Sequence, residues 1–172
     1  NMLDLAGIPI WSRDRGENDP FIVGGGPCVY YTEPIADFFD FFIVGEGEEL
    51  ICETVDVFRS WQEAGKPEGR QGLLKRLAVL DGIYVPSFYD VTYNQQGLFA
   101  DIEPACPEAK PIIYKRLIKD MDSVRFVEKP VLPYIDIVHD RIMLELFRGC
   151  TRGCRFCQAG TSYRPVRERS MD

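Results

Sequence analysis

The sequence predicts an α/β protein in which a partial parallel sheet is followed by a β-rich connector and then by a strand that ends in a cysteine loop. Three observations support this prediction. Short apolar runs alternate with glycine turns and helical segments up to residue 82, alternating apolar and polar residues surround a turn between 88 and 102, and an apolar strand-like segment at 141–147 leads into three closely spaced cysteines. Repeated strand, glycine turn and helix are typical of open parallel sheets, whose ligands lie beyond the carboxyl ends of the strands.

The first predicted domain, residues 1–82, contains two buried strands that each end in a glycine turn. Residues 21–23 form the first strand, and the turn at 24–27 lets the backbone approach a ligand or a neighbouring helix closely. Residues 41–44 form the second strand, which stops at the acidic glycine turn 45–49. Both turns are expected at the same edge of the sheet.

Helical segments follow these strands. Pro34 at a first helical position indicates a short helix over 33–39, and the acidic residues at 46–49 suit the first turn of a longer helix that continues through Trp61. We expect those carboxylates to stabilise the helix rather than to act in catalysis. A further helix is predicted over 71–80. Because residues 1–5 resemble the inside of a helix, the natural chain is expected to begin earlier.

The second predicted region, residues 83–138, is a connector. Residues 88–93 and 98–102 alternate in polarity on either side of the turn 94–97, which predicts a β-hairpin. Residues 112–118 indicate a further strand. The prolines within 129–134 favour an ordered linker.

Composition and cysteine usage set the cellular context. The chain has 172 residues, of which 45% are hydrophobic and 27% charged, as in ordinary globular domains. Its start lacks a basic leader followed by an apolar stretch, and no apolar run is long enough to cross a bilayer, so we expect a cytoplasmic protein with no membrane partner. Thiols stay reduced there, which favours metal ligands or small buried hydrophobes over disulfides. Cys28, Cys52 and Cys106 lack metal-ligand spacing and are predicted to be buried.

The third predicted region, residues 139–172, carries the candidate metal ligands Cys150, Cys154 and Cys157 in a C-x3-C-x2-C run. Thiolate sulfur is the usual ligand of iron–sulfur clusters. Three thiolates would leave one iron of a four-iron cubane open to a substrate or cofactor. Zinc is the alternative, and its fourth ligand would come from Cys106 or His139. If it binds no metal, His139 is interpreted as a linker or surface histidine.

Charge is distributed unevenly around these cysteines. Residues 1–140 carry 13 basic and 24 acidic side chains, whereas residues 141–172 carry 7 basic and 3 acidic side chains. Arg148, Arg152 and Arg155 would lower the pKa values of nearby thiols and offset an anionic cluster. A plain solvated surface and a patch for RNA are the alternatives.

The run 145–157, with its C-x3-C-x2-C spacing and an aromatic residue before the last cysteine, resembles the cluster-binding signature of radical S-adenosylmethionine (radical SAM) enzymes. The resemblance implies a [4Fe–4S] cluster on Cys150, Cys154 and Cys157. It also implies that S-adenosylmethionine binds the fourth iron, with Phe156 near its adenine, and is reductively cleaved to a 5′-deoxyadenosyl radical. An electron donor such as a flavodoxin or a ferredoxin is implied as a partner. The fold implied for this region is the first strand and loop of an incomplete (β/α) barrel.

Residues 22–27 and 40–49 resemble the later strands of the Rossmann-like cobalamin (B12)-binding domain that precedes the barrel in one subgroup of these enzymes. Gly25 and Gly26 match the position that approaches the nucleotide tail of cobalamin. They are therefore candidate cofactor-binding residues, although a tight turn explains them equally well. The Asp-x-His-x-x-Gly segment, whose histidine ligates cobalt in that domain, is absent, and the histidine present, His139, falls in the linker.

The resulting hypothesis is a fragment of a radical SAM iron–sulfur enzyme of the oxidoreductase or transferase kind, with an unknown substrate. Methylthiolation, methylation, cyclisation and rearrangement all remain open. Because the barrel stops fifteen residues after Cys157, the fragment is expected to be inactive by itself. The alternative is a non-catalytic module with a zinc or electron-transfer site.

Overall fold

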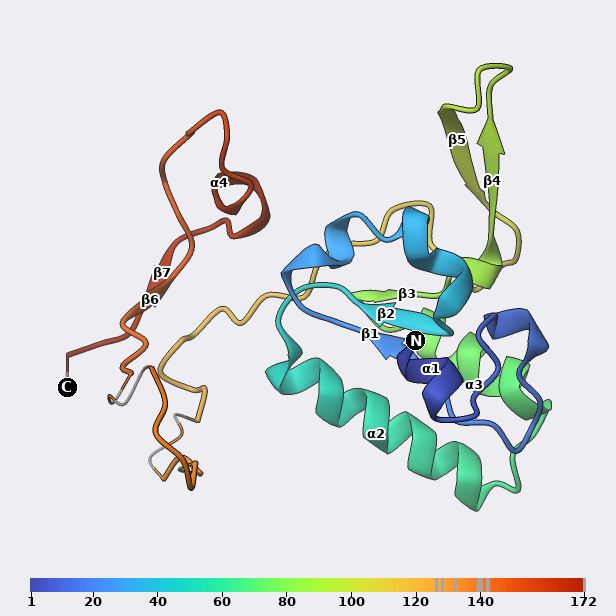
Figure 1. Cartoon of the computed structure of the whole chain (residues 1–172), viewed down its shortest axis with the longest axis horizontal. Coiled ribbons are helices and arrows are strands. Elements are labelled where there is room, and N and C mark those ends of the chain that lie inside the picture. Colours follow the sequence, from blue (N-terminus) through green and yellow to red (C-terminus); the bar gives the residue numbers. More distant parts are fainter. Residues whose placement is uncertain (126, 128, 132, 139–140, 142, 172) are drawn as a thin grey trace. The chain divides into compact units, whose positions relative to one another are not determined.

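The computed structural model describes residues 1–172 except 126, 128, 132, 139, 140, 142 and 172. Its contacts divide the chain into two compact units, Asn1–Leu117 (unit 1) and Ile118–Asp172 (unit 2), which are described separately below (Figure 1). The boundary divides the predicted connector 83–138, so that its hairpin belongs to unit 1 and residues 118–138 belong to unit 2. Among the described residues, no helix is long and apolar enough to cross a membrane.

Unit 1 is built on a small mixed sheet in the order β1-β2-β3, with β1 at Val23–Gly24, β2 at Phe41–Ile43 and β3 at Ile83–Tyr84. β1 and β2 are parallel, as the sequence predicted, so their glycine turns leave the same edge. β3 is antiparallel to β2, which corrects the purely parallel expectation. The reason is connectivity: two helices lie between β2 and β3, so the second helix returns the chain to the edge where β2 ended.

Both long helices occur close to where their patterns predicted them. They are α2 at Gly47–Glu63 and α3 at Gly69–Ala78, and the four-residue α1 occupies Met2–Leu5. The predicted helix at 33–39 is the 3₁₀ helix η3, Glu33–Phe38, with Pro34 in its first turn. The remaining 3₁₀ turns are η1 at Ser12–Asp14, η2 at Pro27–Tyr30 and η4 at Pro86–Phe88.

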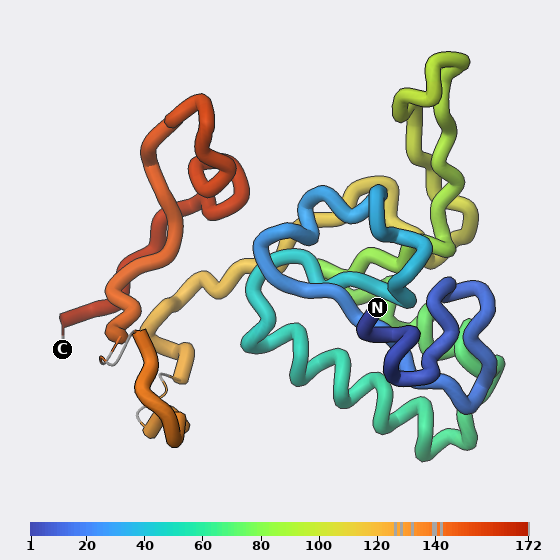
Figure 2. The backbone as a smooth tube through the Cα atoms, in the orientation of Figure 1, coloured from blue at the N-terminus to red at the C-terminus, as the bar shows by residue number. Residues whose placement is uncertain are grey.

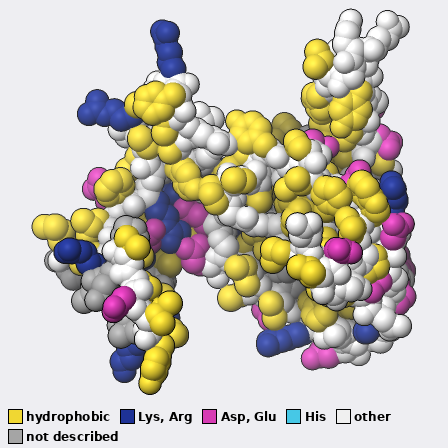
Figure 3. All heavy atoms as spheres, viewed as in Figure 1, with side chains coloured by type: hydrophobic (Ala, Val, Ile, Leu, Met, Phe, Trp, Pro, Cys, Tyr) yellow, Lys and Arg dark blue, Asp and Glu magenta, His cyan; other side chains and the backbone are white. Residues whose placement is uncertain are grey.

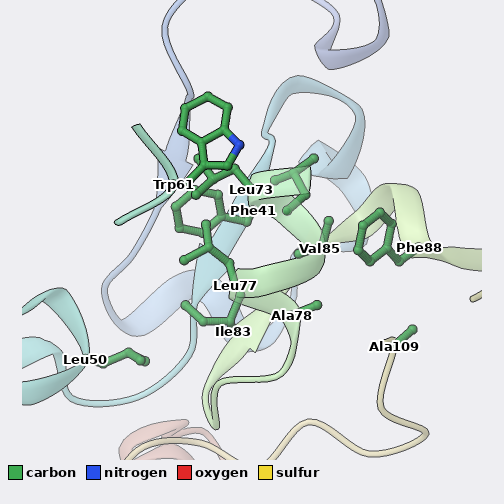
Figure 4. Packing of buried hydrophobic residues seen from close by; sticks show 11 residues of the cluster. Phe41, Leu50, Trp61, Leu73, Leu77, Ala78, Ile83, Val85, Phe88 and Ala109 are labelled. Atoms are coloured by element: carbon green, nitrogen blue, oxygen red, sulfur yellow. The ribbon is translucent and has the colours of Figure 1, made fainter. Parts of the chain in front are cut away.

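Alternation along β2 gives the sheet two buried faces. Phe41 packs with buried residues of α2, α3 and β3, including Leu50, Leu73 and Ile83 (Figure 4). The next residue, Phe42, points to the opposite face, where it packs with Val29 of η2 and with Tyr84. Because successive side chains of a strand point to opposite faces, one short strand supplies both cores.

Burial of the isolated cysteines differs from the prediction. Cys28 and Cys52 are exposed, so the expectation that they are buried is wrong. Cys28 turns outward from η2 while its neighbour Val29 is buried, and Cys52 lies on the solvent side of α2, two residues after buried Leu50. Cys106 is partly buried and packs against the first core cluster.

A buried ionic network that no sequence pattern indicated fixes the N-terminal loops of unit 1. Asp40, at the start of β2, receives hydrogen bonds from Arg15 and Arg70 at 2.8 Å each and from the backbone N–H of Ile22 at 2.7 Å. The Arg15 side chain is fully buried, and its Nη2 also donates to the carbonyl oxygen of Phe38. Arg70 of α3 donates to the Asp19 carbonyl at 2.6 Å. This network therefore ties residues 15–22 to β2 and α3.

The predicted hairpin is confirmed as β4, Tyr89–Tyr93, paired antiparallel with β5, Phe99–Pro104. The Asn94 side chain closes its turn by accepting hydrogen bonds from the backbone N–H groups of Gln96 and Leu98. The hairpin projects from unit 1 (Figure 2). Residues 112–118, predicted to be a strand, form one isolated parallel bridge, Gly45 with Arg116.

Unit 2 contains β6 at Phe147–Arg148, α4 at Ala159–Ser162 and β7 at Arg167–Glu168. β6 pairs antiparallel with β7. Over the residues that the structure describes, the predicted strand 141–147 is therefore shorter than expected and begins later in the sequence. Residue 142 lies outside the described residues. The barrel arrangement stays a prediction.

Candidate metal centre in the cysteine loop

The cysteine loop begins immediately after β6 and is closed at its base. Gly149 adopts a φ of 109°, and a Cβ at this position would lie 2.6 Å from the carbonyl oxygen of Tyr163 and 2.8 Å from that of Pro165. The N–H of Cys150 donates to the same Tyr163 carbonyl at 3.2 Å. Glycine is therefore required at 149 both for its backbone conformation and for the close approach.

The far side of the loop folds back against α4. The N–H of Cys157 donates to the carbonyl of Cys154 at 3.1 Å, which forms a tight turn between these two ligands. Gly160 in α4 is buried, and a Cβ there would contact the carbonyl oxygen of Arg152. Gly153, by contrast, has no atom within 4 Å of the position that a Cβ would take.

All three candidate ligands are free thiols on this loop. Cys150 is partly buried, whereas Cys154 and Cys157 are exposed. Within the described part of the chain, no three Cys, His, Asp or Glu side chains come together into a group that could hold a metal ion. The donor set suits an iron–sulfur cluster in its chemistry and accessibility.

Three other residues entered the prediction of this site: Phe156, Cys106 and His139. Phe156 is 92% exposed beside Cys157. Cys106 belongs to unit 1, where it packs against the core, and His139 lies outside the described residues. Neither is observed as a fourth ligand.

A cavity of about 310 Å³ opens beside the first candidate ligand. Its lining consists of Cys150, Thr151, Arg164, Pro165 and Val166. A larger, mainly apolar cavity of about 580 Å³ lies in unit 1 between α2 and β1, and none of the predicted site residues lines it.

The arginines near the cysteines have different roles. Arg148 donates two hydrogen bonds to Glu145, at 2.6 and 3.0 Å, and these bonds hold the pKa of the Glu145 carboxyl below its usual value. This arginine therefore stabilises the approach to β6. Arg152 and Arg155 are exposed, and basic side chains project from the loop in the space-filling view (Figure 3).

Arg167 of β7 and Arg169, which follows it, tie this end of unit 2 to residues 118–124, and the sequence analysis did not predict these contacts. Arg167 donates to the carbonyl of Ile118 and Arg169 to that of Met121, both at 2.6 Å. The N–H of Ser170 donates to the Asp122 carboxylate at 2.9 Å. The alternation of Arg167 and Arg169 places both on one face of a strand, and this was the signal that could have predicted the contacts.

Gly25 and Gly26 lie in the turn after β1. Gly26 has a φ of 94°, and neither position has an atom within 4 Å of an added Cβ. The tightly packed glycine here is Gly24, the last residue of β1, where a Cβ would contact the Phe42 ring. The backbone conformation of Gly26 therefore confirms the turn, and its contact with a cofactor stays a prediction.

Residues 1–86 match the sequence model of a family described as radical SAM proteins, N-terminal. Because the match covers half of the chain, the chain belongs to this family. Membership of this family implies, in general, S-adenosylmethionine and an iron–sulfur cluster as cofactors.

Among curated proteins, the chain is similar to an uncharacterized protein of Methanocaldococcus jannaschii, with 28% identity over 173 residues. The alignment covers 93% of this chain and 28% of the relative, so the chain spans less than a third of the relative's length. No solved structure matches the chain.

Proposed function

We propose that unit 2 carries the cluster-binding loop of a radical SAM enzyme, in which Cys150, Cys154 and Cys157 hold a [4Fe–4S] cluster and S-adenosylmethionine binds at the open iron. The observation that supports this most strongly is the C-x3-C-x2-C run on one accessible loop, in a chain whose first half matches the radical SAM family. When bound, such a cluster supplies the electron that reductively cleaves S-adenosylmethionine.

The chain's own residues contribute binding and orientation. Gly149 and the Cys150–Tyr163 hydrogen bond fix the first ligand at the base of the loop. The turn joining Cys154 to Cys157 holds the other two close in sequence and space. We expect cluster binding to draw the three thiols together, as is common when a metal site forms on binding.

Surface features of the loop support the remaining parts of the proposal. Exposed Arg152 and Arg155 would offset the charge of an anionic cluster. The exposed ring of Phe156 is available to the adenine of S-adenosylmethionine. An electron donor such as a flavodoxin or a ferredoxin completes the proposed system, and a reducing cytoplasmic compartment suits the free thiols.

Anaerobic reconstitution of the chain with ferrous iron and sulfide tests this proposal. We expect about four irons and four sulfides per chain, with broad visible absorbance, because three thiolates suffice for a cubane with one open iron. A parallel sample should be offered zinc. Tight stoichiometric zinc binding combined with no sulfide-dependent iron uptake would overturn the proposal and favour the zinc module.

A further inference from the structure

The last segment of unit 1, residues 114–117, lies along the end of β2; we call it the strap. The N–H of Arg116 donates to the carbonyl of Val44 at 2.8 Å, and the N–H of Glu46 donates to the carbonyl of Arg116 at 3.0 Å. These two bonds form a parallel bridge between Gly45 and Arg116. Figure 1 shows this part of the chain passing the connection from β2 to α2.

The strap occupies the edge of the sheet where open α/β folds take their ligands. β1 and β2 are parallel, so the turns that follow them lie at one edge. In such folds ligands bind beyond this edge, and the N–H groups at a helix N-terminus receive their anionic groups. Here the N–H of Glu46, the residue that precedes α2, already donates to the strap.

Gly45 is adapted to the strap. It has a φ of 106°, and a Cβ at this position would lie 2.5 Å from the backbone nitrogen of Arg116, with the carbonyl oxygen of the same residue still closer. The space that the missing side chain provides is therefore filled by this chain's own backbone. Gly25, in the turn after β1, contrasts with it because no atom lies within 4 Å of an added Cβ.

Side chains of the strap reach elements that follow both strands. Arg116 donates to Glu49 at 3.1 Å and forms a second ion pair with Glu53, both on α2. The Lys115 ammonium lies 5.9 Å from the ring centroid of Tyr30 in η2, which follows β1. The strap is thus anchored on both sides of the edge, by backbone bonds, ion pairs and a cation–π contact.

We infer that the strap occupies this edge of the sheet in place of a ligand. Unit 1 therefore holds neither cobalamin nor a nucleotide there. The strap instead fixes the point at which the chain leaves unit 1. The cobalamin-type resemblance of residues 22–27 and 40–49 is then a likeness of strands and turns without the cofactor.

Hydrogen exchange followed by mass spectrometry tests this inference. In the wild-type chain, the amides of Arg116 and Glu46, which donate in the bridge, should exchange at least about tenfold more slowly than in Gly45→Ala, because they open only when the bridge breaks. Gly45→Ala should remove that protection, since its Cβ would contact the strap backbone. Gly25→Ala is the matched control and should retain it.

Two further measurements test the same inference independently of Gly45→Ala. If Gly45→Ala fails to fold, Arg116→Gln decides, because it removes the ion pairs to α2 and should speed exchange in the strap while leaving β2 protected. Equilibrium dialysis of the wild-type chain against hydroxocobalamin should show no retained corrinoid. Rapid exchange of the wild-type strap, or retained hydroxocobalamin that protects residues 45–47, would overturn the inference.

Discussion

Asp40→Ala should cost unit 1 about 3–5 kcal/mol of its free energy of unfolding, because removing one partner of a buried ion pair leaves the remaining charges uncompensated. Here two guanidinium groups depend on the same carboxylate. The side chains of Arg15 and Arg70 are at most 9% exposed, so water cannot replace the lost oxygens without opening the loops. The backbone N–H of Ile22 would lose its acceptor as well.

Chemical denaturation followed by tryptophan fluorescence measures this effect, since both tryptophans, Trp11 and Trp61, lie in unit 1. The matched control is Asp56→Ala. Asp56 pairs with Arg59 at 4.0 Å on the surface of α2, where both side chains are at least 70% exposed, so its loss should change the free energy by less than about 1 kcal/mol. Equal effects of the two substitutions would show that the network around Asp40 does not stabilise the fold.

Cys150→Ala should reduce the iron bound after anaerobic reconstitution from about four atoms per chain to less than about one, because two thiolates do not retain a cubane cluster. The effect is expected to be large because Cys150 is the partly buried ligand fixed at the base of the loop. Iron and acid-labile sulfide are measured together with the visible spectrum.

Cys28→Ala and Cys52→Ala are the matched controls for this substitution. Both residues are exposed free cysteines of unit 1, so they report any unspecific capture of iron by thiols. They should leave the iron content unchanged. An equal loss of iron in a control and in Cys150→Ala would contradict the assignment of the cluster to the loop.

Sequence patterns predicted those helices and turns that are determined by residues within the same short segment. The acidic turn before α2 and the Asn94 turn of the hairpin are sequence features, and the structure has a helix and a hairpin where these features indicated them. The spacing of Cys150, Cys154 and Cys157 was also readable, because it lies within one loop, whereas the iron–sulfur cluster on it stays a prediction.

Features that depend on distant contacts were not predictable in the same way. Asp40 and Arg70 are 30 residues apart, and no period or motif links them. A strand was expected over 112–118, which includes the strap. Its regular pairing is limited to the bridge with Gly45, because the segment that contains Gly45 is already turning into α2. Burial of Cys28 and Cys52 was predicted from residue type, whereas their exposure is set by which side of a helical turn faces the core.

The proposed open iron is tested most directly by mild oxidation of the reconstituted chain with ferricyanide, with electron paramagnetic resonance as the readout. Because one iron of the proposed cluster lacks a protein thiolate, we predict the loss of about one iron in four and the appearance of a three-iron cluster signal. Retention of all the iron, or the absence of any paramagnetic cluster in reconstituted wild-type chain, would contradict the assignment of Cys150, Cys154 and Cys157 as a three-thiolate site.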